Sequence, residues 1–568
     1  MTADRRTGGE ILADQLLIHG VDTVFAVPGE SYLPVLDAFF DRRDALRLIT
    51  CRHEAGAANM AEAAGKLTGR PGVCLVTRGP GACHASVGVH TAHQDSTPML
   101  LLVGQVARNT RGREAFQEID VRDMFQAPMA KWAVEIEDTG RLPELLHAAF
   151  RTATSGRPGP VVVGLPEDML QETAQVGDAG SWTPARAYPA PADVERAHRL
   201  LAEAERPLLI AGGGNWTPAG REALATLAEV ADAPVAVSFR RQDLVDNEHP
   251  HYAGDLSTSV DPRLVERVRS ATLLMVLGAR LGEMTTGGYA TIRPGRQSVP
   301  LVHVHADPFE LGRVFIPDLA VAADPGAFAA ALAGRDFPSG PARQAWREAA
   351  HDDYLRASTP EPYAADLDMG QVMLHLRATM PSDTVITVDA GNFSGWAQRF
   401  WRFRHPRSQL GPTSGAMGYS VPAGVAASIV APEREVVSFV GDGGFQMSGQ
   451  ELATAAQHGA RPLVLVINNS MYGTIRMHQE RSYPGRTIGT DLKNPDFAVL
   501  AKVYGAHGER VTRTEQFPDA LARARSSGTA AVIELVVDPE QITTRTTLAE
   551  LHGTGAGNSQ PNSGQAGT

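Results

Sequence analysis

Short runs of apolar and β-branched residues alternate with Ala- and Leu-rich stretches along almost the whole chain. Clear examples of the apolar runs are GVCLVT, PLLIAGGG, TLLMVLGAR, TVITVDAGN, EVVSFVGDGG and PLVLVINN. A strand that is apolar at nearly every position is buried on both faces, so the pattern predicts α/β domains in which helices cover parallel sheets. Many of these runs end directly in Gly, Asp or Asn. Ligands bind at the carboxyl ends of strands in such sheets, and these ends are therefore the expected place for a functional site.

A chain of 568 residues is too long for a single hydrophobic core. Two stretches rich in Pro, Gly and Ala, at about 173–193 and 357–370, are typical of linkers. Cutting there predicts three α/β domains of similar size, over 1–175, 190–345 and 365–547. We expect a disordered tail over 548–568, because its last residues, GTGAGNSQPNSGQAGT, lack aromatic and branched apolar side chains.

Composition excludes several classes of protein. The net charge is −12 and no basic patch is present, so nucleic acid is not an expected partner. The longest apolar stretch, near PMLLLVGQV, is too short to span a bilayer, and the first residues do not have the pattern of a signal peptide. The three cysteines, Cys51, Cys74 and Cys83, lack metal-ligand spacing, and their odd number argues against a disulfide framework. A cytoplasmic location is expected.

The strongest motif begins where the run EVVSFV ends in Gly441-Asp442-Gly443-Gly444. A helical stretch follows, and the next apolar run, PLVLVI, ends in Asn468-Asn469. Glycines allow a backbone to approach phosphate closely, and a helix start presents N–H groups to anions. Asp442 and Asn469 offer a carboxylate and an amide oxygen, which with a backbone carbonyl and diphosphate oxygens could complete a Mg²⁺ shell. A lone Gly-Asp-Gly is more often a simple turn, but both halves at strand ends favour a metal–diphosphate site.

This pattern resembles the GDG…NN diphosphate-binding motif of thiamine diphosphate enzymes, the family of acetolactate synthase, pyruvate oxidase and the 2-oxo acid decarboxylases. The segment ITCRHEAGAANMAEAAGKLTGRPGVCLVTRGPGACHASVGVHTAHQDSTPMLLLVGQV resembles the pyrimidine-binding domain of that family, and GRPGPVVVGLPEDM resembles its closing strand. The resemblance covers nearly the whole chain except the tail. It implies three doubly wound parallel-sheet domains, which in the family are the pyrimidine-binding, central and diphosphate-binding domains.

The resemblance also implies roles in the first domain. The glutamate that matches Glu54 hydrogen-bonds a ring nitrogen of the cofactor's aminopyrimidine and promotes the tautomer that deprotonates the thiazolium ring. Without the resemblance, Glu54 would be an acidic residue stabilised at a helix start. Gln117, in AFQEID, resembles an active-site glutamine of the family.

In the last domain the resemblance implies a cofactor cradle. Gly391 and Asn392, in VDAGNF, would hold the diphosphate, and the backbone of Gly415 would meet the pyrimidine amino group. Met417 would be the bulky wedge under the bent cofactor, although it could instead be an ordinary core methionine. The carbonyl of Met471 would be a backbone ligand of the metal.

The expected cofactors are thiamine diphosphate and Mg²⁺, while FAD stays open. Some members bind FAD in the central domain, and Gly212-Gly213-Gly214 and Gly278-Ala279-Arg280 resemble flavin-contacting turns, although such turns are common in any α/β domain. Where acetolactate synthases carry Asp-Asp-Arg, this chain reads LGEMTTG and lacks the arginine that would hold a substrate carboxylate.

The leading hypothesis is therefore thiamine diphosphate-dependent decarboxylation of a small-molecule 2-oxo acid followed by carboligation to a second carbonyl, as in acetolactate synthase. A simple 2-oxo acid decarboxylase of the benzoylformate or pyruvate type, an FAD-linked oxidase and a non-catalytic subunit with the same fold are the alternatives. In the family, one subunit supplies the glutamate and another the diphosphate clamp, which implies a homo-oligomer with shared active sites.

Overall fold

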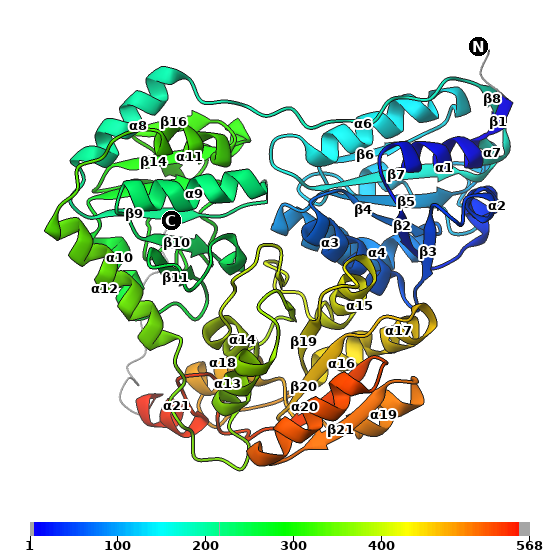
Figure 1. Ribbon diagram of the computed structural model, residues 1–568. Helices are drawn as coiled ribbons and strands as arrows, with labels where there is room; N and C mark the ends of the chain where they lie inside the picture. The colour runs from blue at the N-terminus through cyan, green and yellow to red at the C-terminus, as the bar shows by residue number, and fades with distance from the viewer. Residues whose placement is uncertain (1–4, 215, 556–568) are drawn as a thin grey trace, which may run out of the picture.

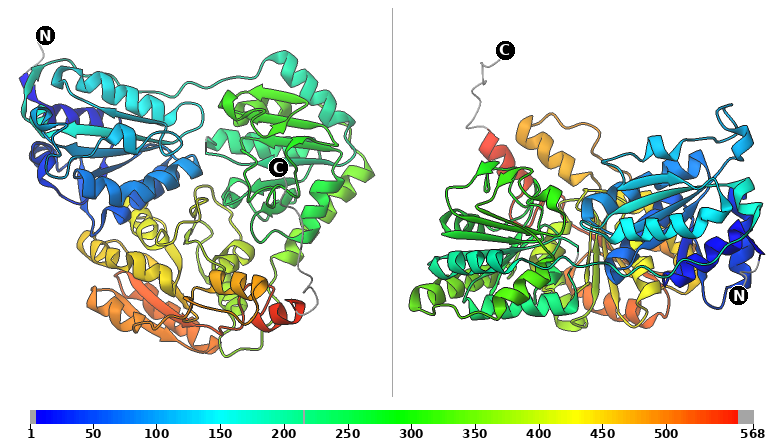
Figure 2. Two further views of the ribbon diagram at one scale, coloured as in Figure 1. Left: turned by 180° about the vertical axis from the view of Figure 1, so that it is seen from behind. Right: turned by 90° about the horizontal axis from the view of Figure 1, so that it is seen from above.

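Three α/β units lie at the corners of a triangle in the computed structural model, which describes residues 5–214 and 216–555 (Figure 1). The first unit lies at the upper right, the central unit at the upper left and the third unit below both. Seen from above, the first and central units lie side by side (Figure 2). The three-domain α/β fold expected from the alternating pattern is confirmed.

The first unit contains a six-stranded parallel sheet in the order β3-β2-β4-β5-β7-β6. Its strands are β2 (Thr23–Ala26), β3 (Arg47–Thr50), β4 (Gly72–Val76), β5 (Met99–Gln105), β6 (Trp132–Glu135) and β7 (Pro160–Pro166). The helices are α1 (Gly8–Ile18), α2 (Leu33–Asp41), α3 (Glu54–Thr68), α4 (Gly79–Asp95), α5 (Val121–Met124), α6 (Leu142–Thr154) and α7 (Glu167–Gln171). A short antiparallel pair, β1 (Arg5–Thr7) and β8 (Thr173–Gln175), closes the unit.

The third unit repeats this strand order, with a parallel sheet β18-β17-β19-β20-β22-β21. Its strands are β17 (Val385–Val388), β18 (Gln409–Leu410), β19 (Val436–Gly441), β20 (Leu463–Asn468), β21 (His507–Val511) and β22 (Ala531–Val536). Its helices are α13 (Met369–Thr379), α14 (Ser394–Phe400), α15 (Ser420–Val430), α16 (Asp442–Ser448), α17 (Leu452–His458), α18 (Gly473–Ser482), α19 (Phe497–Val503), α20 (Phe517–Ser526) and α21 (Leu548–Gly555), with the short 3₁₀ helix η6 (Gly449–Glu451) between α16 and α17.

The central unit has a different strand order, β11-β10-β9-β12-β14-β16, which is the order of the dinucleotide-binding doubly wound fold. Its strands are β9 (Pro207–Ala211), β10 (Val235–Ser238), β11 (Tyr252–Leu256), β12 (Leu273–Leu277), β14 (Leu301–His305) and β16 (Leu319–Ala322). The helices are α8 (Pro191–Glu203), α9 (Pro218–Val230), α10 (Pro262–Ser270), α11 (Pro325–Ala333) and α12 (Pro341–Ala357), and β13 (Gly295–Arg296) pairs with β15 (Phe315–Ile316).

The connections between the units contain no helix or strand over 176–190 and 358–368, which fall within the two stretches expected to be linkers. Each large sheet lies within one of the three expected ranges. The domain boundaries themselves stay predictions.

The prediction of a disordered tail is wrong over 548–555, where the chain forms helix α21. Leu548 and Leu551, one helical turn apart, are buried with Met471, Met477 and Ile542 in a small apolar cluster. Burial of these leucines stabilises the helix. The sequence prediction missed it because it relied on the polar composition of the last residues of the chain. The remainder of the predicted tail, 556–568, lies outside the described residues.

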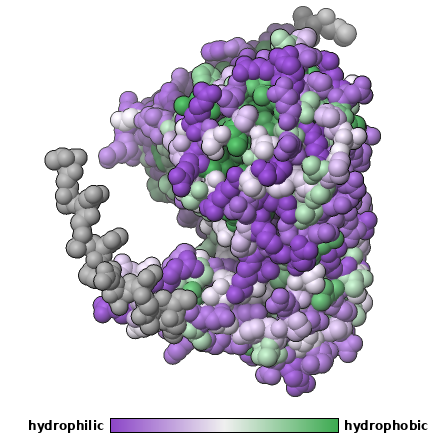
Figure 3. All heavy atoms as spheres, turned by 90° about the vertical axis from the view of Figure 1, so that its left-hand side faces the viewer, coloured by the Kyte–Doolittle hydropathy of each residue, from purple (hydrophilic) through white to green (hydrophobic). Residues whose placement is uncertain are grey.

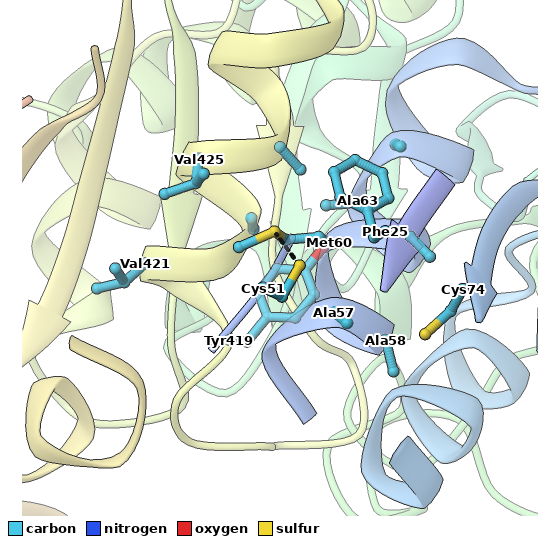
Figure 4. Close-up of a cluster of buried hydrophobic side chains, with 14 of the residues drawn as sticks. Phe25, Cys51, Ala57, Ala58, Met60, Ala63, Cys74, Tyr419, Val421 and Val425 are labelled. Carbon is cyan, nitrogen blue, oxygen red and sulfur yellow. Dashed lines mark hydrogen bonds between the residues drawn. The ribbon is translucent and has the colours of Figure 1, made fainter. Parts of the chain in front are cut away.

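One hydrophobic core runs across the boundary between the first and third units. Helix α3 contributes Ala57 and Met60 to this core, and the third unit contributes Tyr419, just before α15, and Val421, in its first turn (Figure 4). The Cys51 thiol contacts the sulfur of Met60 within the same cluster. Because close-packed cores resist shear, this shared core fixes the orientation of α3 relative to the third unit.

Polar side chains dominate the face of the molecule shown in Figure 3, and apolar residues appear there in small groups. Among the described residues, no helix is both long and apolar enough to cross a membrane.

Candidate active site

A pocket of about 230 Å³ opens at the carboxyl ends of β17, β19 and β20. Apolar side chains such as Phe393, Trp396 and Ile542 form part of its wall. The pocket brings together every cofactor and metal residue expected in the last domain, which are Gly391, Asn392, Gly415, Met417, Gly441, Asp442, Gly443, Gly444, Asn469 and Met471.

The position of this pocket follows from the strand order. After β17 the chain runs to β18 on one side, whereas β19 and the later strands lie on the other side. The loops that leave β17 and β19 therefore diverge and leave a crevice, which is where open α/β sheets bind ligands. The sequence predicts the site from a polar turn at a strand end. The structure places that turn at the topological switch point, between β17 and β19.

Asp442 is the first residue of α16 and is only 3% exposed. Its Oδ1 accepts a hydrogen bond from the backbone N–H of Gly443 (2.9 Å), and its Oδ2 accepts one from Nδ2 of Asn494 (2.7 Å). Burial raises the pKa of Asp442, while these hydrogen bonds oppose the shift. A bound cation would stabilise the ionised carboxylate that burial disfavours.

The two asparagines after β20 have different environments. Asn468 is turned into the protein, where its Nδ2 donates to Oε1 of Glu534 (2.7 Å) and its Oδ1 accepts from Asn494 (3.0 Å). Asn469 lines the pocket, and its Oδ1 accepts a hydrogen bond from the backbone N–H of Met471 (3.3 Å). Between them and Met471, Ser470 has a φ of 57°, a conformation rare for a non-glycine residue.

The donor set fits a hard divalent cation. Asp442, Asn469 and the carbonyl of Met471 offer only oxygen atoms, which Mg²⁺ prefers, and all three residues line the same pocket. Asn494 connects Asp442 to Asn468 and so positions the carboxylate. Asn494 lies in no motif, and the sequence offered no signal for it.

Asp389 supports the segment that carries Gly415 and Met417. It is fully buried, and its carboxylate accepts hydrogen bonds from the backbone N–H groups of Gly418 (2.7 Å) and Ser420 (2.5 Å). Burial raises the pKa of Asp389 to about 6. Met417 itself is 37% exposed. It therefore lies at the pocket wall and is not the ordinary core methionine that was the alternative interpretation.

Two glycines of the motif are also required by packing. A Cβ at Gly443 would lie 2.5 Å from the Tyr472 ring, and a Cβ at Gly444 would lie 2.4 Å from Oδ2 of Asp389. Gly415 differs, because it has a φ of +73° and open space where its Cβ would be. Backbone conformation, not crowding, accounts for glycine at that position.

Glu54 begins helix α3, at the carboxyl end of the first sheet. Its Oε2 lies 2.9 Å from Nδ1 of His84, in α4, and its side chain is 13% exposed. The His84 ring stacks on His53, with centroids 4.6 Å apart. His53 caps α3 by accepting a hydrogen bond from the N–H of Ala55. The sequence had suggested no role for His84, since only the fold brings α4 beside the start of α3.

Gln117 lies in a loop against the start of α4. Its backbone carbonyl accepts a hydrogen bond from the N–H of Gly79 (2.9 Å), and its φ is 63°. Its neighbour Phe116 is 73% exposed. Glu54 and Gln117 therefore both flank α4 in the first unit, but they do not line the pocket of the third unit: within the described part of the chain, every lining residue lies at or beyond Met369.

The glycine-rich turns of the central unit have a structural explanation. A Cβ at Gly213 would lie 2.2 Å from the carbonyl of Gly278, and one at Gly278 would lie 2.6 Å from the carbonyl of Gly212. The two turns thus pack backbone to backbone. The Arg280 side chain donates a hydrogen bond to the carbonyl of Gln94 in the first unit (2.5 Å). Packing alone therefore requires glycine at Gly213 and Gly278, whether or not a flavin binds.

Three family models match the chain in the same order as the three units. Residues 6–124 match the N-terminal TPP binding domain of thiamine pyrophosphate enzymes, 194–332 match the central domain, and 389–535 match the C-terminal TPP binding domain. The chain belongs to the thiamine pyrophosphate enzyme family. The family resemblance of the GDG…NN motif is thereby confirmed, and the protein is a thiamine diphosphate-dependent enzyme.

Curated relatives align over almost the whole length. The probable acetolactate synthase large subunit of Methanocaldococcus jannaschii is 30% identical, with 94% of this chain and 92% of the relative covered. The acetolactate synthase large subunit of Parasynechococcus marenigrum is 33% identical, with coverage of 94% and 87%. The acetolactate synthase isozyme 2 large subunit of Escherichia coli is 31% identical, with coverage of 94% and 95%.

Proposed function

We propose that this enzyme decarboxylates a 2-oxo acid and joins the remaining unit to a second carbonyl compound, as an acetolactate synthase does. One observation carries the proposal: a single pocket gathers ten residues that the family motifs assign to thiamine diphosphate and its metal. The relatives are named acetolactate synthase large subunits, and these names favour carboligation as the outcome of the reaction.

The third unit would hold the charged end of the cofactor. Asp442, Asn469 and the Met471 carbonyl would hold Mg²⁺, which would offset the negative charge of the diphosphate. Asn392 also lines the pocket, and its backbone N–H and side chain are hydrogen-bonded to Thr474 (3.0 and 3.1 Å), which would hold this loop in place beside the cofactor. When bound, thiamine diphosphate supplies the carbanion chemistry that releases carbon dioxide and attacks the second carbonyl.

Gly415 and Met417 would orient the cofactor. Gly415 lines the pocket and has open space where a Cβ would lie, so its backbone could meet an amino group there. Met417 offers an unbranched apolar side chain at the wall. Asp389 holds both through its hydrogen bonds to Gly418 and Ser420, so the orienting segment is rigid.

Glu54 would move the proton that activates the cofactor, and Gln117 would contact the substrate beside it. Neither residue lines the pocket of its own chain, so we infer a homodimer, at least, in which the first unit of one subunit completes the pocket of the other. The partly exposed Glu54 carboxylate and the exposed Phe116 ring next to Gln117 support this inference, because both are available to a partner.

Product analysis with Glu54→Gln tests the proposal. Wild-type enzyme given pyruvate, or an aromatic 2-oxo acid, should release carbon dioxide and form a 2-hydroxyketone product; an aldehyde product would indicate a simple decarboxylase instead. Glu54→Gln should keep its fold and lose about 10²- to 10⁴-fold in turnover, the usual contribution of a positioned proton-transfer group. Near-normal turnover of Glu54→Gln, or no product from any 2-oxo acid, would refute the proposal.

An FAD-linked oxidase is a second candidate, because one cavity suits a phosphate-rich ligand. It measures about 400 Å³, lies where strands of the central unit end, and is bordered by Gly213 and Gly214. Among the described residues, five cationic side chains and two carboxylates line it; the cations are Lys66, Arg186, Arg221, Arg241 and Arg407. These cations would hold the diphosphate of FAD, and the flavin would supply electron acceptance. A colourless purified protein would exclude this candidate.

A cytoplasmic location is part of the proposal. Cys51, Cys74 and Cys83 are all free thiols in the structure, as a reducing compartment would keep them.

A further inference from the structure

The segment that carries Glu54 is held by a buried carboxylate from the third unit of the same chain. This carboxylate belongs to Glu451, in η6, which follows α16 directly. Helix α16 begins with Asp442 and forms part of the cofactor pocket. Glu451 therefore stands nine positions after the expected metal ligand and touches a distant part of the chain.

The contacts of Glu451 are specific to the start of α3. Its Oε1 accepts hydrogen bonds from the backbone N–H groups of Arg52 (3.2 Å) and His53 (3.0 Å). Its Oε2 accepts a hydrogen bond from Oγ1 of Thr454 (2.6 Å) and lies 3.2 Å from the N–H of Arg52. The two N–H groups belong to the residues immediately before Glu54, so the carboxylate fixes the backbone from which the Glu54 side chain extends.

Burial makes these contacts costly to lose. Glu451 is 0% exposed, and this burial raises the pKa of its carboxyl group while the hydrogen bonds oppose the shift. A buried acceptor without partners costs far more than one that is hydrogen-bonded, so Glu451 and the N–H groups of Arg52 and His53 constrain one another.

Gly56 shows that α3 is shaped to receive this carboxylate. A Cβ at Gly56 would lie 2.3 Å from Oε1 of Glu451. Glycine inside a helix is less favourable than alanine. Here glycine gives the Glu451 carboxylate the space that it needs to reach the turn before Glu54.

We propose that Glu451 is a positioning residue: through it, the cofactor-binding unit of each subunit sets the reach of Glu54 into the pocket of the partner subunit. The inference rests on the proposed function, in which Glu54 acts on the cofactor held by the partner. The two active sites of a dimer would then be linked mechanically. In each subunit, α16, η6 and Glu451 connect the pocket to the Glu54 that serves the pocket of the partner subunit.

Single variants test the positioning role. Glu451→Gln keeps the size of the side chain but presents an N–H group to donors, and it should lower kcat about ten- to hundredfold, as expected for a small misplacement of a reacting group. The KM for the 2-oxo acid and the cofactor affinity should change less than about twofold. Gly56→Ala should likewise lower kcat with little change in KM or cofactor affinity. It changes α3 instead of Glu451, and its Cβ would displace the same carboxylate although alanine favours a helix.

Gln457→Ala is the matched control. Gln457 is exposed and joins the same two segments through the Arg52 side chain (2.6 Å), without touching Glu451. Its loss should leave kcat unchanged. If Glu451→Gln and Gly56→Ala retain wild-type kcat, or if their losses appear only in KM or cofactor affinity, the inference is wrong.

Mixed dimers separate this role from a direct effect on the cofactor. In the first dimer, one subunit carries Glu54→Gln and the other Glu451→Gln, so the only remaining Glu54 sits on a subunit without Glu451, and turnover should be low. In the second dimer, one subunit carries both changes and the other is wild type, so the remaining Glu54 keeps its own Glu451. That dimer should show about half of wild-type turnover, because a correctly positioned Glu54 enters one of its two pockets.

If the first mixed dimer were more active than the second, Glu451 would act on the pocket of its own subunit. That result would overturn the inference, while the proposed function would stand. Full activity of the Glu54→Gln homodimer would instead refute the proposed function itself, and the inference with it. The two failures are therefore distinguishable in one set of purified proteins carrying two different affinity tags.

Discussion

Asp442→Asn should have opposite effects on the stability of the enzyme with and without the proposed Mg²⁺. In the metal-free protein, Asp442 is a buried carboxylate whose pKa is raised. Ionisation of a group with a raised folded-state pKa lowers the stability of the folded protein as the pH rises through that pKa. Asparagine removes this cost at neutral pH and retains an acceptor for the N–H of Gly443. We therefore expect the metal-free variant to be at least as stable as the wild type.

The stabilisation by Mg²⁺ should largely disappear. A ligand at a concentration one hundred times its Kd adds about 2.7 kcal/mol of stability. Loss of an outer partner of a metal ligand typically weakens affinity about 10- to 100-fold, and loss of the carboxylate ligand should reach at least the upper value. At the same Mg²⁺ concentration a 100-fold weaker site adds only about 0.4 kcal/mol. The difference of about 2.3 kcal/mol corresponds to roughly 5–9 °C in Tm for a unit of this size.

The assay is thermal unfolding of both proteins, with saturating thiamine diphosphate, over a series of Mg²⁺ concentrations. Asp519→Asn is the control, because it removes the same charge from an exposed position in α20 of the same unit. It should leave the rise in Tm produced by Mg²⁺ unchanged. A metal-dependent rise in Tm that survives in Asp442→Asn would refute the placement of the metal, and a metal-free variant several degrees less stable than the wild type would refute the argument from burial.

Three further outcomes follow from the structure. Met417→Ala should lower kcat without changing the Mg²⁺ dependence, since Met417 lines the pocket but offers no oxygen; steady-state kinetics across Mg²⁺ concentrations checks this. Leu548→Asp should release α21 from its apolar cluster and expose the segment to protease, at a local cost of about 2–5 kcal/mol, and an unchanged digestion pattern would contradict it. Wild type should lose stability relative to Asp389→Asn as the pH rises from the ordinary 3.8 of an aspartate to about 6, because burial raises the pKa of Asp389; urea unfolding at several pH values would show the opposite trend if this is wrong.

Local patterns were sufficient to predict the fold class, because strands such as β19 and β20 are apolar at nearly every position and leave no solvent-facing side. Their order in the sheet was not predictable from these patterns. The finding that the first and third sheets share one strand order, while the central sheet has another, depends on long-range pairing that no single segment encodes.

The same distinction applies to the pocket. The place of Asp442 and Asn469 in the pocket was predictable, because each is a polar residue directly after an apolar strand, where open sheets bind ligands. Asn494 and His84 were not, since each acts on a residue far away in the chain and belongs to no spacing pattern. Asp389 does follow an apolar strand, β17, but its hydrogen bond to Gly418 could not be read from that pattern. Helix α21 was missed for a related reason: its two leucines matter only because Met471, Met477 and Ile542 form a surface for them.

The position of Glu54 explains why a half-site can look incomplete in one chain and still be well ordered. Its helix is held by the core that α3 shares with α15 and by the carboxylate of Glu451, both within the same subunit. Nothing from the partner is needed to fix its direction. In the proposed dimer, a pre-ordered Glu54 would lose little conformational freedom when two subunits associate, so more of the interface energy would remain to stabilise the dimer. The tight packing of α3 on the third unit therefore makes the proposed active site, divided between two chains, physically reasonable.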